Sequence, residues 1–470
     1  MRQKRVHIVT MGCQMNVYDS EQMLRLLAPL NYKPTSRLEN ADLVLLNTCS
    51  IREKAEHKVY SLLGRLSRAK KKRPNLIIGV GGCVAQQEGD RLMKRAPYVD
   101  IVFGTFALAR LPSLIQKAEE RNKRIVDTDS RRPSEPLCVK EPIFNDGRAT
   151  AFVTIMQGCN NFCTYCVVPY VRGREISRVP DDIIDEISLL VEDGVREVTL
   201  IGQNVNAYGK EKGTECDFSA LLERVNDIEG LRRIRFTTSH PKDLSGRLIE
   251  VFSVLDKLAP HIHLPVQSGS DRVLELMNRG YTRRFYLDKV AELRRSRPDI
   301  AITSDIIVGF PGEQKEDFQH TVDLVRQVEF DSLFTFKYSD RPSVPAVKFA
   351  NKVPADISAE RLAFILEVQK AFTVKGYEAL VGTTQEILIQ GDSKKSPAQL
   401  TGRTPCNRVV NISSGVGGTA RTGQILSVKI VEAYPHSLLG VLAEDMDGPL
   451  SGQNGGISDA ARNESVRLNH

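Results

Sequence analysis

The sequence predicts a multidomain α/β protein: an N-terminal parallel α/β sheet domain, a partial (β/α)6 barrel and a small C-terminal all-β barrel, in that order. Three observations support this prediction. The chain has 470 residues, more than one hydrophobic core usually organises. Apolar, strand-like runs alternate with helical patterns as far as residue 375. After Gly382, short β-rich pieces divided by Gly, Ser and Asn take over.

Composition narrows the class of protein. Hydrophobic residues make up 41% and charged residues 26% of the chain, as in ordinary globular proteins. No run approaches the roughly 18 apolar residues of a membrane span. The basic start MRQKRVHIVT leads straight into an expected strand, without the apolar region and cleavage site of a secretory signal. We therefore expect the protein in the cytoplasm, with no membrane partner. We also expect a monomer.

Residues 1–122 are expected to form the first domain. Apolar runs at 6–10, 43–47, 76–80 and 101–103 are typical of strands, and each is followed by a polar, periodic stretch. This alternation predicts a parallel sheet with crossover helices. Residues 123–148 are polar, contain three prolines and lack clear periodicity, which predicts a linker.

Residues 149–377 are expected to form the second domain. Six strand-helix units begin with strands at 152–156, 197–201, 233–238, 262–266, 302–308 and 332–338. A complete eight-unit barrel typically needs about 250 residues, so these units predict an open, partial barrel. A charged amphipathic helix is expected at 358–375.

The C-terminal part of the chain has a different texture. Strands expected at 385–390, 407–412 and 424–431 predict a small β-barrel over residues 378–442. Residues 443–470 are rich in Gly, Ser, Asn and Asp and are expected to form a disordered tail.

Positive charge is concentrated in the first third of the chain. Residues 1–140 hold 26 Lys and Arg against 14 Asp and Glu, a balance of +12, whereas the remainder holds 39 against 44, or −5. Such asymmetry favours a polyanionic partner. The densest basic run, at 65–73, can equally be the solvated end of a helix.

Three of the nine cysteines form a compact motif, Cys159, Cys163 and Cys166, directly after the first strand of the second domain. Iron–sulfur clusters are ordinarily held by four thiolates, so a C-x3-C-x2-C run without a fourth cysteine nearby leaves one iron open. The alternative, a structural zinc site, needs a fourth local ligand, and no His or Cys lies within forty residues after Cys166. The motif therefore predicts an iron–sulfur cluster with an open iron.

Three further cysteines are dispersed along the first domain. Cys13, Cys49 and Cys83 are separated by 36 and 34 residues, and each follows an expected strand. Because the carboxyl ends of parallel strands meet at one edge of a sheet, we expect the three thiols to converge and hold a second cluster. Gly12, Gly81 and Gly82 would let the backbone approach it. The alternative is three unrelated buried thiols.

The compact motif resembles that of the radical S-adenosylmethionine superfamily, with Tyr165 in the aromatic position before the last cysteine. The resemblance implies that the amino and carboxylate groups of S-adenosylmethionine chelate the open iron. It also implies that one electron from the reduced cluster releases a 5′-deoxyadenosyl radical, which abstracts hydrogen from an unactivated C–H bond.

With both cysteine sets and the terminal barrel, residues 5–442 resemble the methylthiotransferase family: an N-terminal cysteine domain, a radical domain and a barrel of the TRAM type. The runs MGCQMN at 11–16 and CVVPYVRGRE at 166–175 are similar to the tRNA branch of that family, as are GQNVN, LPVQSGS and DIIVGFPGE at 202–206, 264–270 and 305–313. Asp340 and Ser343 stand where the family usually has Pro and Gly.

The resemblance implies a sulfur-group transferase acting on C2 of N(6)-isopentenyladenosine at position 37 of tRNA anticodon loops. One S-adenosylmethionine would methylate a sulfur on the cluster of Cys13, Cys49 and Cys83, and another would supply the radical. The anticodon stem-loop of tRNA, an electron donor such as flavodoxin, and a sulfur source or iron–sulfur carrier are the implied partners. Alternatives are methylthiolation of threonylcarbamoyladenosine or of a ribosomal-protein aspartate, and, in a different class, a non-catalytic RNA-binding protein.

Other candidate site residues lie at the ends of the expected barrel strands, where such barrels build active sites. The expected contacts to S-adenosylmethionine or substrate are from Gln203, Asn204, Gln267, Ser268 and Glu313, although polar residues at these places also cap helices and turns. We expect Arg172, Arg174 and Arg178 to hold the base or the methionine, and Arg403 and Asn407 to contact RNA. Cys138, Cys216 and Cys406 lack partner spacing and are interpreted as structural thiols.

Overall fold

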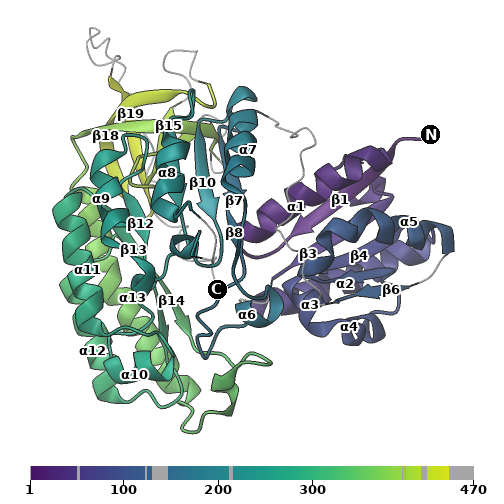
Figure 1. The fold of residues 1–470 in the computed structure, drawn as a ribbon, viewed down its shortest axis with the longest axis horizontal. Helices are drawn as coiled ribbons and strands as arrows, with labels where there is room; N and C mark the ends of the chain where they lie inside the picture. The colour runs from purple at the N-terminus through teal and green to yellow at the C-terminus, as the bar shows by residue number, and fades with distance from the viewer. Residues whose placement is uncertain are drawn as a thin grey trace, which may run out of the picture.

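The computed structural model describes residues 2–49, 53–121, 124–129, 147–210, 215–393, 396, 399–413 and 421–443. It contains an N-terminal sheet domain, a central half-open barrel and a C-terminal β-barrel (Figure 1). Residues 444–470 of the expected tail, most of the expected linker and Cys138 lie outside the described residues. In the described part of the chain, every helix is too short or too polar to cross a membrane.

The N-terminal domain is a six-stranded sheet in the order β2-β1-β3-β4-β5-β6, with every pairing parallel. Its strands are β1 (Lys4–Thr10), β2 (Tyr32–Pro34), β3 (Leu43–Thr48), β4 (Ile77–Gly82), β5 (Ile101–Phe103) and β6 (Ile125–Asp127). Helices α1 (Gln14–Leu27) and α5 (Leu111–Arg121) pack on one face, and α2 (Glu53–Lys72), α3 (Cys83–Glu88) and α4 (Asp90–Arg95) on the other. All six residues of β3 are buried, as expected of a central strand covered on both faces.

Strand β6 corrects one boundary of the sequence analysis. Ile125 pairs with Ile101, and Asp127 forms an ion pair with Arg110 at 2.7 Å, so residues 125–127 belong to the sheet and not to a linker. The expected boundary at residue 122 therefore falls before the last strand of this domain. An edge strand of three residues between charged neighbours leaves little periodicity in the sequence.

The central domain has the six parallel strands that the sequence predicts. They form two three-stranded sheets joined by a bridge between Ile234 and Leu258. The strands are β7 (Thr150–Thr154), β10 (Glu197–Ile201), β11 (Arg233–Phe236), β12 (His261–His263), β13 (Ala301–Val308) and β14 (Ser332–Lys337). The main helices on the outside are α7 (Pro180–Glu192), α8 (Phe218–Asn226), α9 (Gly246–Val254), α11 (Arg283–Ser296), α12 (Lys315–Val328) and α13 (Ala355–Glu378). They bury one continuous core against the strands.

The C-terminal domain is a closed barrel in the order β15-β16-β17-β19-β18. Its strands are β15 (Thr384–Asp392), β16 (Gln399–Arg403), β17 (Val409–Ser413), β18 (Ile425–Tyr434) and β19 (Ser437–Leu442). The all-β prediction is confirmed, and strands β16 and β19 complete the barrel beyond the three expected ones. The barrel lies at the opposite end of the central domain from α6 (Val168–Val171), the short helix that faces the N-terminal domain (Figure 1).

Candidate active site at two cysteine sets

The dispersed cysteines lie at the carboxyl ends of three adjacent strands, β1, β3 and β4. Cys13 precedes α1, Cys49 follows β3, and Cys83 begins α3. The thiols of Cys13 and Cys49 are hydrogen-bonded to each other, and this bond lowers the pKa of Cys13 to about 6, helped by the charge of Arg172 against the effect of burial. Burial raises the pKa of Cys83, and Arg172 opposes that shift. The structure thus brings these thiols into one electrostatic environment.

The glycines beside these thiols have a different role from the expected one. Gly12 has φ +116°, and a Cβ there would lie 2.1 Å from Cys49 Cβ. A Cβ on Gly82 would lie 2.4 Å from the Thr48 carbonyl oxygen, and one on Gly81 would meet the Phe103 ring at 2.3 Å. The glycines therefore let neighbouring strand ends approach each other, and Gly12 lets the thiols of Cys13 and Cys49 meet.

Arg172 reaches this thiol set from the central domain. Its side chain is 4% exposed, pairs with Asp19 Oδ2 at 2.6 Å and donates to Asn16 Oδ1 at 3.3 Å. Both partners lie on α1 of the N-terminal domain, and the guanidinium is hydrogen-bonded to Cys83. The expected role of Arg172 in holding substrate gives way to a contact with the N-terminal thiols.

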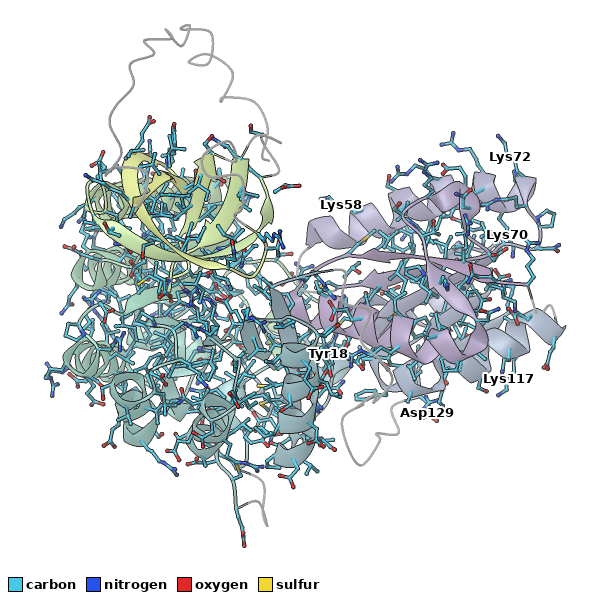
Figure 2. All side chains as sticks on the ribbon, turned by 90° about the horizontal axis from the view of Figure 1, so that it is seen from above. Tyr18, Lys58, Lys70, Lys72, Lys117 and Asp129 are labelled. Atoms are coloured by element: carbon cyan, nitrogen blue, oxygen red, sulfur yellow. The ribbon has the colours of Figure 1, made fainter. Side chains whose placement is uncertain are left out.

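Arg178 also differs from its expected role. It is 2% exposed, and it donates to Glu186 Oε2 and to the Thr154 carbonyl, both at 2.7 Å. Glu186 also receives Arg25 of α1 at 3.3 Å and accepts from the Tyr18 hydroxyl. Figure 2 shows Tyr18 at the junction of the two domains. Arg178 is therefore part of a buried network that joins the domains, which removes it from the substrate contacts.

The compact cysteine motif occupies the loop after β7, as predicted. The loop is held against residues 173–175: Cys159 N–H donates to the Gly173 carbonyl at 3.0 Å, and Asn160 N–H donates to Glu175 Oε1 at 3.1 Å. Burial raises the pKa of Cys159 to about 11 and that of Cys166 to about 12. Arg174 is exposed with its guanidinium 5.6 Å from the centre of the Phe162 ring, so it is the one member of the expected arginine trio that faces solvent.

A second buried arginine touches this motif. Arg279 is 4% exposed and donates to Cys163 Sγ and to the Tyr165 hydroxyl, both at 3.4 Å. Its other nitrogens donate to the Pro265 carbonyl at 2.7 Å and to the Tyr281 hydroxyl at 3.0 Å. Sequence reasoning missed Arg279, because nothing in its local pattern shows that it folds back onto the motif 116 residues earlier.

The rim of the barrel beside the motif carries polar atoms without protein partners. Asn204 is 1% exposed; its Nδ2 donates to Asp243 at 2.9 Å and to Glu175 at 3.3 Å, while its Oδ1 has no partner. Ser239 Oγ and His240 Nε2, at the end of β11, are likewise buried and unpartnered. Unsatisfied buried polar atoms are rare and call for a ligand or water. Of these three residues, the sequence singled out Asn204 alone.

The other expected rim residues form hydrogen bonds within the protein. Gln203 Oε1 accepts from Gly158 N–H in the motif loop. Gln267 has φ +72° and bridges Asp305 and Ile307 through its backbone, and Ser268 Oγ lies 3.2 Å from the Ser270 N–H. Glu313 is buried, accepts from Gly309 N–H at 3.0 Å and pairs with Arg361. In this structure, the side chains of Gln203, Ser268 and Glu313 hold the rim loops.

The loop with Arg403 and Asn407 is braced by its own side chains and docks on the central domain. Arg403 donates to the carbonyl and side-chain oxygens of Asn407 at 2.9 and 3.1 Å, so the two residues brace their own loop. Its backbone docks on the central domain: Arg235 donates to the carbonyls of Thr404 and Pro405 at 2.8 and 2.6 Å. The expected RNA contact at Arg403 and Asn407 stays a prediction, and both side chains are partly exposed.

The basic run at 65–73 serves the fold at two of its positions. Lys70 pairs with Asp100 at 2.8 Å, and Arg73 donates to the carbonyls of Leu38, Glu39 and Ala41. Lys70 and Lys72 lie at the end of the N-terminal domain away from the barrels (Figure 2). The helix-end interpretation accounts for this run.

The two cysteine sets fit iron–sulfur clusters by their donor chemistry. All six cysteines are free thiols, which are soft ligands, and they lie at or after strand ends. A buried arginine contacts each set, Arg172 at Cys83 and Arg279 at Cys163, and its positive charge would counter the charge of the thiolates. Within the described ranges, no three Cys, His, Asp or Glu side chains are grouped as ligands of a single metal ion. The unpartnered atoms of Asn204, Ser239 and His240 suit a polar small molecule beside the compact set.

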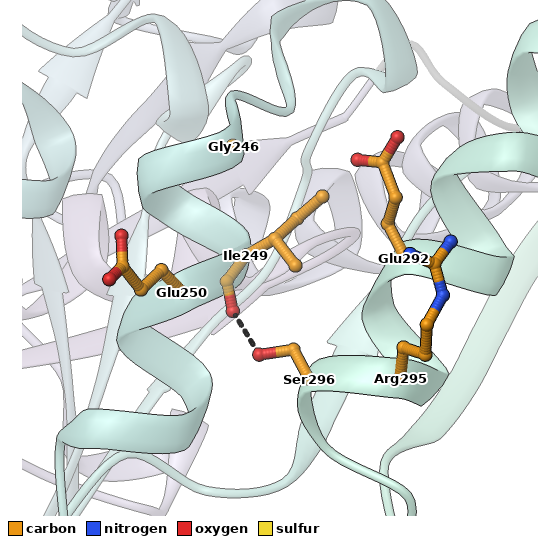
Figure 3. Close-up of a pocket in the computed structure, with 6 residues that line it drawn as sticks. All are labelled: Gly246, Ile249, Glu250, Glu292, Arg295 and Ser296. Carbon is orange, nitrogen blue, oxygen red and sulfur yellow. Dashed lines mark hydrogen bonds between the residues drawn. The ribbon is translucent and has the colours of Figure 1, made fainter.

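A surface pocket of about 400 Å³ lies elsewhere, between α9 and α11 on the outside of the barrel. Its six lining residues are Gly246, Ile249, Glu250, Glu292, Arg295 and Ser296 (Figure 3). Ser296 donates to the Ile249 carbonyl at 3.0 Å, which ties the two helices together. The pocket contains no cysteine and is separate from both thiol sets.

Comparisons with known proteins match the three domains. Residues 5–104 match "Uncharacterized protein family UPF0004", residues 153–325 the Radical SAM superfamily, and residues 378–443 the TRAM domain. A tRNA-2-methylthio-N(6)-dimethylallyladenosine synthase of Syntrophus aciditrophicus is 51% identical over 444 residues, covering 94% of this chain and 95% of that protein. The protein of the same name from Syntrophobacter fumaroxidans is 51% identical over 437 residues, covering 93% and 95%.

Solved structures show a similar fold at low identity. The radical S-adenosylmethionine methyltransferase TsrM from Kitasatospora setae, with cobalamin and a [4Fe-4S] cluster bound, covers 85% of this chain and 81% of its own, with a TM-score of 0.56 and 13% identity. The cobalamin-dependent radical enzyme OxsB, with aqua-cobalamin and S-adenosylmethionine bound, covers 78% and 56%, with a TM-score of 0.51 and 14% identity. These likenesses concern the fold alone.

Proposed function

This chain belongs to the family of tRNA-2-methylthio-N(6)-dimethylallyladenosine synthases, and on that premise we propose that it transfers a methylthio group to C2 of N(6)-isopentenyladenosine at position 37 of tRNA. Membership of the Radical SAM superfamily implies one [4Fe-4S] cluster and S-adenosylmethionine. A second cluster, held by Cys13, Cys49 and Cys83, is part of the proposal. The single observation that carries it is the position of both cysteine sets at one domain interface.

That interface is built by the segment after the compact motif. Cys166 is followed by α6, whose Val171 packs with Val167, Val344 and Cys83 in one buried cluster. Six residues after Cys166, Arg172 contacts the N-terminal thiols. A short stretch of chain thus joins the two sets, as a transfer from one site to a radical formed at the other requires.

When bound, the two clusters and S-adenosylmethionine would supply radical hydrogen abstraction and the methylthio group. The chain's own residues would provide the ligands and the surroundings. Cys159, Cys163 and Cys166 would hold the first cluster, with Tyr165 packed edge-on against Phe310 behind it. Asn204, Ser239 and His240 would orient S-adenosylmethionine through the atoms that lack protein partners.

Partners follow from the proposed reaction. The anticodon loop of tRNA would reach the site with its target base unstacked. Arg174, exposed beside Phe162 of the motif loop, would contact a phosphate. An electron donor such as flavodoxin and a sulfur source or iron–sulfur carrier complete the set, and the cytoplasm is the compartment where they would meet.

Nucleoside analysis tests the proposal. The full chain, reconstituted anaerobically, is incubated with S-adenosylmethionine, a reductant and tRNA that carries isopentenyladenosine, and the digested nucleosides are weighed by mass spectrometry. We expect the 2-methylthio product from the natural chain and from the control Cys406→Ala, whose thiol lies outside both cysteine sets and donates to the Asp299 carbonyl at 3.6 Å. Cys13→Ala and Cys166→Ala should each abolish it.

The outcomes separate the rival functions. Product on threonylcarbamoyladenosine or on a ribosomal-protein aspartate would replace the substrate assignment and keep the chemistry. A colourless preparation that binds tRNA and contains no iron would make the chain an RNA-binding protein. The proposed enzyme should carry about eight irons per chain if both clusters are cubanes.

A further inference from the structure

We infer that Arg172 is a positioning residue supplied by the central domain to the N-terminal domain: it fixes the thiols of Cys13 and Cys83 and favours the reduced state of the cluster that they hold. The inference rests on the proposed function, because that cluster is part of the proposal. It adds a specific role for a residue that the sequence placed among the substrate contacts.

The backbone of Arg172 is held rigidly at the domain interface. It follows α6, and the Thr105 hydroxyl of the N-terminal domain donates to the Val171 carbonyl. Arg172 N–H donates to the Val168 carbonyl at 2.8 Å. Val171 and Cys83 share a buried apolar cluster, so the start of the arginine side chain lies beside α3.

The guanidinium is oriented by partners on α1. Asp19 pairs with it at 2.6 Å, and Asn16 Oδ1 accepts from it at 3.3 Å. Asn16 Oδ1 also accepts from the Cys13 thiol at 3.7 Å, while Asn16 Nδ2 donates to the Met11 carbonyl at 2.9 Å. One amide oxygen is thus shared by the arginine and a candidate cluster ligand, which couples their positions.

The charge of Arg172 acts on this site at short range. The side chain is 4% exposed, so water screens little of its interaction with thiolates. Hydrogen bonds to cluster sulfurs and nearby charge are the levers by which a protein sets a cluster's potential. A buried cation stabilises the more negative, reduced state, so its removal should make reduction harder.

Arg178 is the matched control. It lies in the same interface, is 2% exposed and is paired with Glu186 at 2.7 Å. Its guanidinium also donates to the Tyr18 hydroxyl and to the Thr154 and Asp182 carbonyls. A role that is only structural would be shared by both arginines. An effect on the thiol site should belong to Arg172.

The experiment isolates the N-terminal cluster. In the full chain with Cys159, Cys163 and Cys166 changed to Ala, the remaining cluster is titrated anaerobically with reductant and followed by electron paramagnetic resonance. Arg172→Gln should make the reduced state at least tenfold less favoured, a shift of about 59 mV to lower potential for one electron. Arg172→Lys should shift it less, and Arg178→Gln should leave it unchanged.

Each outcome decides between the claims. An unchanged potential in Arg172→Gln, or an equal shift in Arg178→Gln, overturns the inference and leaves the proposed function standing. Loss of iron in Arg172→Gln but not in Arg172→Lys or Arg178→Gln supports positioning, whereas loss in all three overturns it. If the parent triple-cysteine variant holds no cluster, the proposed function fails and takes the inference with it.

Discussion

Gly12 allows the close approach of Cys13 and Cys49 in the N-terminal site. Its φ of +116° lies where side chains other than glycine are strained, and its Cα faces the side chain of Cys49. The thiol of Cys13, one residue later, can approach Cys49 only because this position carries no Cβ. A single methyl group is therefore enough to test whether the thiols must converge.

Gly12→Ala should remove the N-terminal cluster and leave the other in place. The new Cβ would lie 2.1 Å from Cys49 Cβ and 2.7 Å from its Sγ, so Cys49 must move. Iron analysis should fall from about eight to about four atoms per chain, each cubane holding four. Gly64→Ala is the control: that glycine is exposed on α2 with nothing within 4 Å of its Cβ position, and iron should be unchanged. Eight irons in Gly12→Ala would contradict the convergence of the thiols.

Burial of His240 should make the stability of the folded chain depend on pH. It is 5% exposed, and burial, followed by the charges of Arg279, Lys242 and Lys210, holds its pKa far below the usual 6.5. The folded chain keeps this imidazole neutral, whereas the unfolded chain takes up a proton below pH 6.5. Its contribution to stability is therefore complete above that pH and declines as pH falls.

The slope expected from His240 is about 1.4 kcal/mol per pH unit below the usual pKa. Urea unfolding of the natural chain and of His240→Gln, at pH values from about 7.5 down to about 5, measures it. The stability difference between them should change with pH below about 6.5 in favour of the variant. Parallel profiles would show that His240 is protonated in the folded chain.

At the scale of elements, α7 joins the domains through one carboxylate. Glu186 receives both Arg25 and Arg178, and all three side chains are less than 8% exposed. Removing one partner of a buried ionic group leaves uncompensated charge, which typically costs about 3–5 kcal/mol. Glu186→Gln should therefore lower the free energy of unfolding by that order, measured in urea, and speed proteolysis between the domains.

Asp181 on the same helix provides the comparison. It pairs with Arg224 at 2.6 Å, but the two side chains are 78% and 43% exposed. Surface ion pairs contribute roughly 0–1 kcal/mol, so Asp181→Asn should change little. Equal losses from the two substitutions would mean that the Glu186 network is not the link between the domains.

The strands show where sequence patterns suffice. The six barrel strands were predictable because long apolar runs alternate with helices. Strand β16 was not, since its sequence QLTGR has one large apolar residue. Strand β19 contains Gly440, a residue that suggests a break; yet a Cβ there would lie 2.2 Å from Val428 Cγ1, so the barrel needs glycine.

In the candidate site, too, some features follow from the sequence pattern and others depend on tertiary contacts. The placement of Cys13, Cys49 and Cys83 at neighbouring strand ends follows from the rule for parallel sheets, which is local. The partners of Arg172 do not follow, because Asp19 lies 153 residues away in another domain. Arg279 and His240 are likewise chosen by tertiary contacts, which one sequence does not display.

For the whole molecule, the position of the terminal barrel sets how a long substrate can bind. It docks at the amino ends of the central strands: Arg233, the first residue of β11, pairs with Glu386 at 3.0 Å, and Arg235 donates to the Thr404 and Pro405 carbonyls at 2.8 and 2.6 Å. The cysteine loops follow the opposite, carboxyl ends. An RNA that touches both must extend past strands of five residues, about 17 Å.

Loosening this docking should therefore harm long substrates most. Arg235→Met removes the hydrogen bonds to Thr404 and Pro405 but leaves Glu197 paired with Arg233. We expect a larger radius of gyration by X-ray scattering, and a fall in kcat/KM that is severalfold greater for whole tRNA than for an isolated anticodon stem-loop, because a barrel that moves freely no longer holds the second contact at high effective concentration. Arg247→Ala, which removes a surface pair with Glu223, should alter neither measurement. Equal losses on both substrates would place all RNA binding at the cysteine end of the molecule and leave the terminal barrel without a share in it.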